Sequence, residues 1–216
     1  MRKSEQIIET IAMRQQHRLA SESFLVAVSG IDCSGKGYIT AQIVAGLRQR
    51  GFRVAGINID GWLNLPHLRF NKHQPAEHFY QYAIRFDEMF QQFVLPLKRQ
   101  RSICIEMDFA EETAHAYRKH TYDFQNVEII VLEGIYLLKS IYRQYYDWAL
   151  WVDCSFETAL ERALHRGQEG LPPDETIRAY QSIYFPAQEI HFRVDAPRAA
   201  ADCILINDPR LEQEGA

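Results

Sequence analysis

Apolar residues along this chain follow two alternating patterns, one typical of buried strands and the other of amphipathic helices. Short apolar runs that suit strands cover residues 25–29, 53–59, 127–133, 148–153 and 201–207. Between these runs, apolar residues recur every three or four positions, as they do on one face of a helix. Strands of a parallel sheet are apolar throughout because helices cover both of its faces. The pattern therefore predicts an α/β fold, a doubly wound parallel sheet of about five strands with helices on both faces.

The segments between the strands predict the remaining elements. Helical spacing predicts helices over residues 3–18, 76–97, 156–164 and 180–187, and another from the glycine-rich turn to Gly51. Residues 63–75 predict a long loop, 102–107 a short strand, 111–119 one or two helical turns, and 191–197 a turn. The aromatic residues of the 76–97 helix suit a packed core, and the alternative is a platform on which bases stack.

The first apolar run leads into a glycine-rich segment that carries the clearest chemical signal in the chain. Residues 30–37, Gly-Ile-Asp-Cys-Ser-Gly-Lys-Gly, match the P-loop pattern G-x-x-x-x-G-K-[ST] at every defined position except the last. In such a loop the glycines let backbone N–H groups converge on a phosphate, and the next helix adds the positive end of its dipole. The alternative is a turn that binds nothing, but the strand before it and the helix after it favour a nucleotide site. The residues predicted to contact the nucleotide are Gly30, Ile31, Asp32, Cys33, Ser34, Gly35, Lys36, Gly37 and Tyr38.

Two later strands end in acidic residues. Asp60 follows the strand after the glycine-rich helix, and Glu133 closes the run 127–133. Ligands of open parallel sheets collect beyond the carboxyl ends of the strands, so both carboxylates are expected near the phosphates. We assign Asp60 as the candidate general base, the alternative being an aspartate that only turns the chain before Gly61. Glu133 has the position of a Walker B acid, which delivers a carboxylate to the metal side of a nucleotide.

Two arginines four residues apart, Arg162 and Arg166, precede a segment rich in glycine and proline. Arginines at this spacing share one side of a helix. A mobile segment that carries guanidinium groups suits a lid that closes on a phosphate during its transfer. We predict such a lid over about residues 162–175, the alternative being a solvated helix end without a ligand.

Composition narrows the class of protein. The chain has 216 residues, 47% of them hydrophobic and 24% charged, which suits one globular domain over residues 1–216 with a small lid. A net charge of −4 argues against a nucleic-acid binder. The four cysteines form no C-x-x-C pair and suit buried free thiols. The chain shows no leader peptide and no apolar run of membrane-spanning length, so we expect a cytoplasmic protein without membrane contact.

The order of these motifs resembles the uridine kinase and phosphoribulokinase family of P-loop kinases. The likeness covers residues 24–208 and rests on the P-loop, the acidic strand ends and the arginine pair. It implies transfer of the γ-phosphoryl of ATP, with Mg²⁺, to a hydroxyl of a small molecule, which for uridine kinases is the 5′-hydroxyl of uridine or cytidine. The implied roles are a base for Asp60, contact with the β- and γ-phosphates for Lys36, metal binding for Glu133, and neutralisation of transition-state charge for Arg162 and Arg166.

Two departures from the family pattern bear on this function. Gly37 occupies the position at which the family has a Ser or Thr whose hydroxyl binds Mg²⁺, so water, Glu133, Ser34 or Thr40 must take its place. The segment Asp60-Gly61-Trp62 also differs from the Asp-aromatic-Tyr pattern associated with uridine kinases. The acceptor therefore stays undetermined.

Other functions remain open from the sequence. One is a nucleotide-binding regulatory protein without transferase activity, and another is a kinase for a different small hydroxyl compound. A nucleotide-hydrolysing switch is disfavoured because the chain lacks a base-recognition motif of the N-K-x-D type. The sequence also leaves a homo-oligomeric state open.

Overall fold

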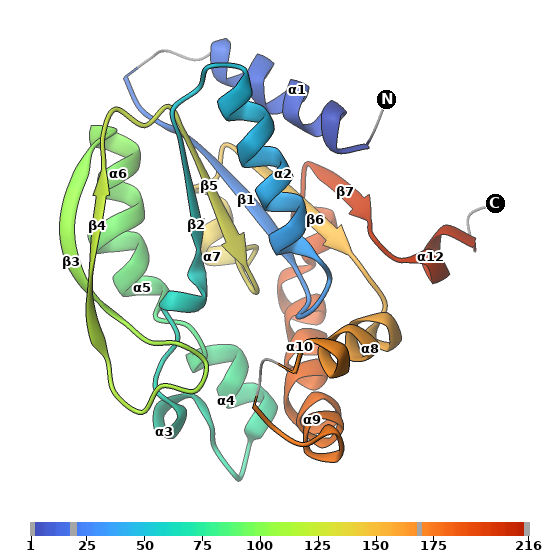
Figure 1. Cartoon of the computed structure of the whole chain (residues 1–216). Coiled ribbons are helices and arrows are strands. Elements are labelled where there is room, and N and C mark those ends of the chain that lie inside the picture. The colour runs from blue at the N-terminus through green and yellow to red at the C-terminus, as the bar shows by residue number, and fades with distance from the viewer. Residues whose placement is uncertain (1–2, 18–20, 168–169, 214–216) are drawn as a thin grey trace.

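The central feature of the structure, a computed structural model that describes residues 3–17, 21–167 and 170–213, is one parallel sheet (Figure 1). Its five strands lie in the order β2-β5-β1-β6-β7. Their bounds are Phe24–Gly30 (β1), Val54–Asn58 (β2), Ile129–Gly134 (β5), Trp148–Asp153 (β6) and Cys203–Ile206 (β7). The five-stranded, doubly wound α/β fold predicted from the sequence is therefore confirmed.

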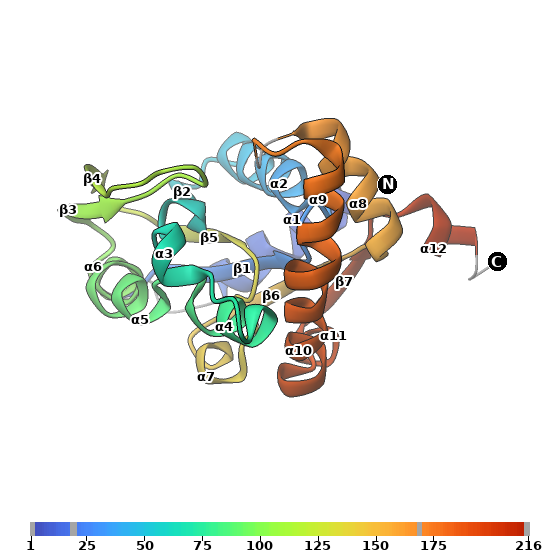
Figure 2. The same ribbon diagram turned by 90° about the horizontal axis from the view of Figure 1, so that it is seen from below.

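Side chains of β1 alternate between two apolar cores, one on each face of the sheet. Val26 and Val28 contact the core that holds α1 (Lys3–Gln16) and α2 (Lys36–Gln49). Leu25 and Ala27 belong to the core on the other face. That face is covered by α4 (Pro75–Tyr82), α7 (Ser140–Arg143) and α10 (Phe185–Asp195), which lie across the sheet from α2 (Figure 2).

The remaining helical segments are short. They are α3 (Pro66–Arg69), α5 (Phe86–Met89), α6 (Leu95–Gln100), α8 (Phe156–Arg166), α9 (Pro173–Ala179), α11 (Pro197–Ala200), α12 (Pro209–Gln213), π-helical segments at Phe90–Val94 and Tyr180–Tyr184, and a 3₁₀ turn at Ile59–Gly61. The stretch 63–75 thus contains helix α3 and is not the continuous loop predicted from the sequence.

A separate antiparallel hairpin corrects the prediction for residues 111–119. Strand β3 (Ile103–Phe109) pairs with β4 (Arg118–Phe124), so no helical turn forms where one was expected, and the second strand was missed. The sequence of β4 is mostly polar and lacks the apolar run of a buried strand. Pairing with β3 stabilises it, together with Tyr122, whose ring stacks on Trp62 at 5.8 Å and lies 4.4 Å from Phe93.

The long helix predicted over residues 76–97 is wrong because the chain breaks between α4 and α5. Ile84 forms an antiparallel bridge with Leu63, and the backbone N–H of Arg85 donates to the carbonyl of Trp62. These contacts with a distant segment outweigh the local helical pattern. The aromatic residues Phe79, Phe86, Phe90 and Phe93 are buried, as expected for a core.

Two further predictions also need correction. Residues 191–195 belong to α10 and not to a turn, because the buried His191 ring bonds to Asp195 one helical turn later, with Nδ1 and Oδ2 2.7 Å apart. Cys33 and Cys154 are buried free thiols as predicted, but Cys104 is exposed on the hairpin. Since β3 lies outside the main sheet, alternate side chains of this strand face solvent.

Candidate active site

A cavity of about 350 Å³ lies at the carboxyl ends of β1, β2 and β5. It is lined by Cys33, Gly35, Lys36, Gly37, Tyr38, Asn58, Asp60, Glu133, Arg162 and Arg166. All residues predicted to act in catalysis or metal binding are therefore together, although they come from four separate parts of the sequence.

The P-loop lies between β1 and α2 and has the tight geometry that its glycines permit. Gly35 has φ 87°, and a Cβ at this position would lie 2.3 Å from Nδ2 of Asn207. Only glycine fits such a position without strain. Of the nine residues predicted to contact the nucleotide, those that line the cavity are Cys33, Gly35, Lys36, Gly37 and Tyr38, and those that do not are Gly30, Ile31, Asp32 and Ser34.

Asp32 does not line the cavity but contacts helix α10. Its carboxylate accepts a hydrogen bond of 3.3 Å from the side-chain amide of Gln188 on α10. Burial raises the pKa of Asp32 above its usual value, and the nearby Asp60 raises it further, against the opposing effect of Lys36. Asp32 thus links the loop to α10.

Arg162, on the cavity wall, bonds to the P-loop. One guanidinium nitrogen donates to the carbonyls of Ser34 at 3.2 Å and Cys33 at 3.4 Å, and the other donates to the carbonyl of Asn207 at 2.9 Å. The side chain of Asn207 donates to the same Ser34 carbonyl at 2.7 Å. These bonds hold the Cys33 and Ser34 carbonyls and so fix the shape of the loop. Asn207 is a site residue that the sequence did not single out for this role.

Lys36 and Glu133 form a buried pair on the cavity wall. The Lys36 ammonium lies 3.9 Å from Oε1 of Glu133 and 3.4 Å from the Ile31 carbonyl, with 12% and 7% of the two side chains exposed. Burial raises the pKa of Glu133, Asp60 adds to this, and Lys36 opposes it. Arg166 also lowers the pKa of Glu133, and a metal ion in the cavity would favour the ionised carboxylate further.

Asp60 stands at the mouth of the cavity on the turn that follows β2. Its backbone N–H donates to Oδ1 of Asn58 at 2.7 Å, which fixes the 3₁₀ turn Ile59–Gly61. The carboxylate is exposed, so it can meet a ligand that enters from solvent. Asn58, which also lines the cavity, was missed in the sequence, although a polar residue at the end of a buried strand is a usable signal.

The cavity offers oxygen donors of the kind that Mg²⁺ prefers. Glu133, Asp60 and Asn58 all line it, and Gly37 leaves open space next to Glu133. In the described part of the chain, no three Asp, Glu, His or Cys side chains form a preformed metal cluster. Mg²⁺ usually takes one or two carboxylates and completes its shell with water and phosphate oxygens, so these residues fit the ion.

The predicted lid lies beside this cavity. Arg162 and Arg166 belong to α8, and α9 begins at Pro173. Residues 168–169 of the predicted lid lie outside the described residues. Closure of the 162–175 segment therefore stays a prediction.

Comparison with known proteins bears on the enzyme class. The chain is 26% identical over 187 residues to the uridine kinase of Serratia proteamaculans (strain 568), a match that covers 84% of this chain and 85% of that protein. Its structure resembles a possible uridine kinase from Bacillus stearothermophilus, with a TM-score of 0.74, 16% identity, and coverage of 94% of this chain and 100% of that one. It also resembles a candidate fructose transport system kinase from Silicibacter sp. TM1040, with a TM-score of 0.73, 19% identity, and coverage of 94% and 99%. No family model matches.

These similarities confirm the resemblance predicted from the sequence motifs. The fold is that of P-loop kinases, and the relatives support a phosphotransferase. Within the described residues, no helix has both the length and the apolar character that crossing a membrane requires.

Proposed function

We propose that this protein transfers the γ-phosphoryl group of ATP to a hydroxyl group of a small molecule, with uridine or cytidine as the first candidate acceptor. The observation that carries the proposal is the convergence of Lys36, Asp60, Glu133 and Arg166 on one cavity beside the P-loop. Phosphoryl transfer depends mainly on positioning and on stabilisation of developing charge, and this set of residues supplies both.

Asp60 is the proposed general base. It lies at the cavity mouth, across from the P-loop lysine, where an acceptor hydroxyl can approach the terminal phosphate. The bond between its own N–H and Asn58 holds the turn in place. The carboxylate would accept the hydroxyl proton as the new P–O bond forms and the bond to the leaving ADP oxygen breaks.

Positive charge is supplied from two sides of the cavity. Lys36 is proposed to bind the β- and γ-phosphates, and Arg166 to neutralise charge on the transferred group from α8. Arg162 is proposed to act as a positioning residue, since its guanidinium already bonds to the P-loop carbonyls. In this proposal only Arg166 of the two arginines contacts the transferred phosphate.

Glu133, with Asn58, is proposed to hold Mg²⁺ directly or through water. The ion would neutralise phosphate charge and orient the terminal phosphate. Because Gly37 has no hydroxyl, water must occupy one more position around Mg²⁺ than in a P-loop that carries Ser or Thr. We expect weaker Mg²⁺ binding as a result.

The names of similar proteins guide the proposal for the compound that accepts the phosphoryl group. Uridine and cytidine come first because the sequence relatives are named uridine kinase. A sugar is the second candidate, since a structural neighbour is described as a fructose transport system kinase and the acceptor-side segment Asp60-Gly61-Trp62 departs from the uridine kinase pattern. A cytoplasmic location agrees with four cysteines that form no disulfide.

The test is ATP turnover with Mg²⁺ and a panel of uridine, cytidine, D-ribose and D-fructose. We expect low turnover alone and strong stimulation by one class of compound. Replacing Asp60→Asn should reduce the stimulated rate by about 10²-fold or more, the usual contribution of a general base, with ATP affinity nearly unchanged. Asp123→Asn, on the exposed hairpin, is the matched control.

The panel also tests the alternative of a regulatory nucleotide-binding protein. Gly37 favours that alternative because it removes a metal ligand. Tight ATP binding without stimulation by any compound would support it and overturn the kinase proposal. Transfer that survives in Asp60→Asn would instead show that the base is another residue.

A further inference from the structure

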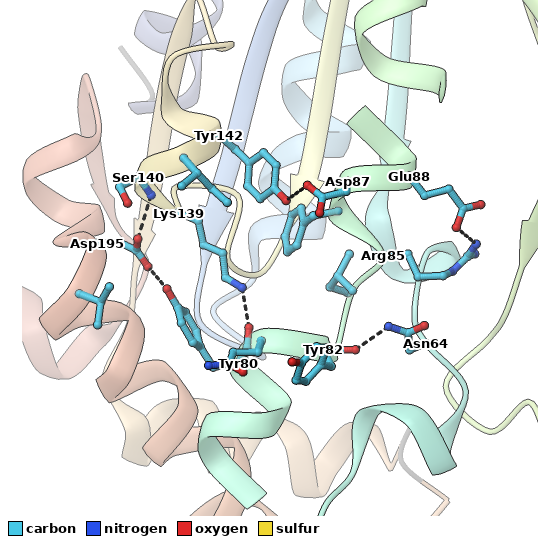
Figure 3. Close-up of a pocket in the computed structure, with 15 residues that line it drawn as sticks. Asn64, Tyr80, Tyr82, Arg85, Asp87, Glu88, Lys139, Ser140, Tyr142 and Asp195 are labelled. Atoms are coloured by element: carbon cyan, nitrogen blue, oxygen red, sulfur yellow. Dashed lines mark hydrogen bonds and ion pairs between the residues drawn. The ribbon is translucent and has the colours of Figure 1, made fainter. Parts of the chain in front are cut away.

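A second cavity of about 460 Å³ lies between α4, α5, α7 and α10, on the face of the sheet opposite α2 (Figure 3). It shares no lining residue with the cavity beside the P-loop. Nothing in the proposed phosphoryl transfer uses it. Its walls combine aromatic rings with charged side chains, a mixture typical of sites for small polar molecules.

Lys139 extends into this cavity from the end of the segment after β5 (Figure 3). The residue is only 8% exposed. Its ammonium donates one hydrogen bond, of 2.5 Å, to the carbonyl of Tyr80 and lies 4.1 Å from the centre of that ring. The ammonium also lies 5.3 Å from the centre of the Phe86 ring and 5.6 Å from that of Tyr136. These rings stabilise its charge, but an ammonium has three donors, and two of them have no hydrogen-bond acceptor among the described residues. Leaving buried donors unfilled is costly, and a ligand in the cavity would remove that cost.

Asp87 offers a complementary group in the wall of the same cavity (Figure 3). Its Oδ1 accepts a hydrogen bond of 2.7 Å from the hydroxyl of Tyr142. Its second oxygen has no hydrogen-bond partner among the described residues, and the residue is exposed to solvent. The cavity thus presents unfilled donors on Lys139 and an unfilled acceptor on Asp87.

The other charged groups of the walls are already paired. Asp195 accepts hydrogen bonds from the Tyr80 hydroxyl, from Nδ1 of His191 at 2.7 Å and from the Ser140 N–H at 2.8 Å. Arg85 pairs with Glu88 at 2.8 Å. These contacts hold the walls in place and leave Lys139 and Asp87 as the groups available to a ligand.

We propose that this cavity binds a small neutral polyhydroxylated compound, a sugar or a nucleoside, whose hydroxyl groups bond to both Lys139 and Asp87. A hydroxyl both donates and accepts, so one compound can satisfy both groups. A phosphate or other dianion is disfavoured by Asp87, Glu88 and Asp195, and a cation is disfavoured by Lys139 and Arg85. The rings of Tyr82, Phe86 and Tyr142 provide apolar surface for the carbon face of the compound.

This proposal does not depend on the kinase proposal, so the test measures binding and not turnover. Uridine, D-ribose and D-fructose are titrated without ATP, and binding is followed by ligand-observed NMR and calorimetry. Comparison of uridine with the two sugars shows whether the cavity prefers a nucleoside or a sugar. Lys139→Met keeps the apolar stem and removes the donors, and Asp87→Asn keeps the shape and removes the charge. Each should weaken binding of the bound probe at least tenfold.

Two variants of the P-loop cavity serve as matched controls. Lys36→Met and Asp60→Asn should leave binding in the second cavity unchanged. Loss of binding in these variants, with none in Lys139→Met, would place the ligand beside the P-loop and overturn the proposal. The proposal would also be overturned if no probe bound at 10 mM. Binding of inorganic sulfate that depends on Lys139, without binding of the three probes, would overturn it as well. Thermal unfolding checks each variant, and Tyr82→Ala at the exposed rim replaces Lys139→Met if that variant does not fold.

Discussion

A Cβ atom on Gly37 would lie 3.9 Å from Oε2 of Glu133, and among the described residues no other group outside its own helix and chain neighbours would lie within 4 Å. The position that carries a hydroxyl residue in most P-loops therefore faces the candidate metal ligand and has room for a side chain. Gly37 lacks this hydroxyl, but the space that a serine side chain would occupy beside Glu133 is open.

Replacing Gly37→Ser should therefore strengthen Mg²⁺ binding. An added hydroxyl can contact the ion or its water shell, and a hydrogen bond to a charged group contributes about 1.5 kcal/mol, close to a tenfold change. We expect the Mg²⁺ concentration that gives half-maximal ATP turnover to fall by about that factor. Gly37→Ala is the control, because it shares the gain in helix propensity but adds no oxygen. Equal effects of Ser and Ala would show that the hydroxyl has no role.

Gly35→Ala should disrupt the P-loop more than Gly51→Ala disturbs the end of α2. Both glycines have φ near 90°, so alanine at either position costs about 1 kcal/mol of backbone strain. At Gly35 the new methyl group would also meet Asn207, whereas at Gly51 no atom of the described part of the chain lies within 4 Å of it. We expect urea unfolding to show a greater loss of stability for Gly35→Ala than for Gly51→Ala. Only Gly35→Ala should also lose ATP affinity. Similar losses for both variants would contradict the role of Asn207 as a support of the loop.

The sequence predicts the part of the site that is encoded by short local patterns. Lys36 follows from the spacing of the P-loop, and Asp60 and Glu133 follow from their places at the ends of apolar runs. Parallel strands bring such residues to one edge of the sheet, so local patterns are enough to predict that they converge.

Contacts between distant segments could not be predicted in the same way. The family resemblance implies a role on the phosphate for Arg162, and that role stays a prediction, whereas the bonds from Arg162 to Ser34 and Asn207 join elements far apart in the chain. Strand β4 was missed because its stability comes from pairing with β3 and from the stacking of Tyr122 on Trp62. The break after α4 likewise depends on pairing with residue 63. In each case tertiary contacts outweigh local propensity.

The two arginines of α8 should respond differently to mutation. Arg162→Gln removes the bonds to the carbonyls of Cys33, Ser34 and Asn207, so we expect a fall in Tm of about 5 °C, from roughly 2 kcal/mol of lost hydrogen bonding, together with weaker ATP binding. Arg166→Gln should lower kcat by about 10²-fold, because its proposed role is in the transition state. Calorimetry and steady-state kinetics on both variants make the comparison. A normal ATP affinity in Arg162→Gln would contradict its role in holding the loop.

Lys139 should make stability rise with pH. Burial lowers the pKa of Lys139 from its usual 10.5 to about 8, with Asp195 and Asp87 opposing the shift only in part. Below pH 8 the lysine is protonated in both the folded and the unfolded chain, and the cost of burying the charge is present in full. Between pH 8 and 10.5 the unfolded chain binds more protons than the folded chain, so the free energy of unfolding increases with pH. The full increase is about 3 kcal/mol.

Lys139→Met is the reference against which this increase is measured, because other groups titrate over the same range. Burial raises the pKa values of Tyr80 and Cys154, so both side chains lower stability as pH rises, and both are present in the variant. The free energy of unfolding of the wild type minus that of Lys139→Met, from urea unfolding between pH 7 and 10, removes their effect. We expect this difference to grow with pH in favour of the wild type. Parallel curves would show that the Lys139 ammonium is well solvated in the folded protein, and a ligand would then gain little by reaching it.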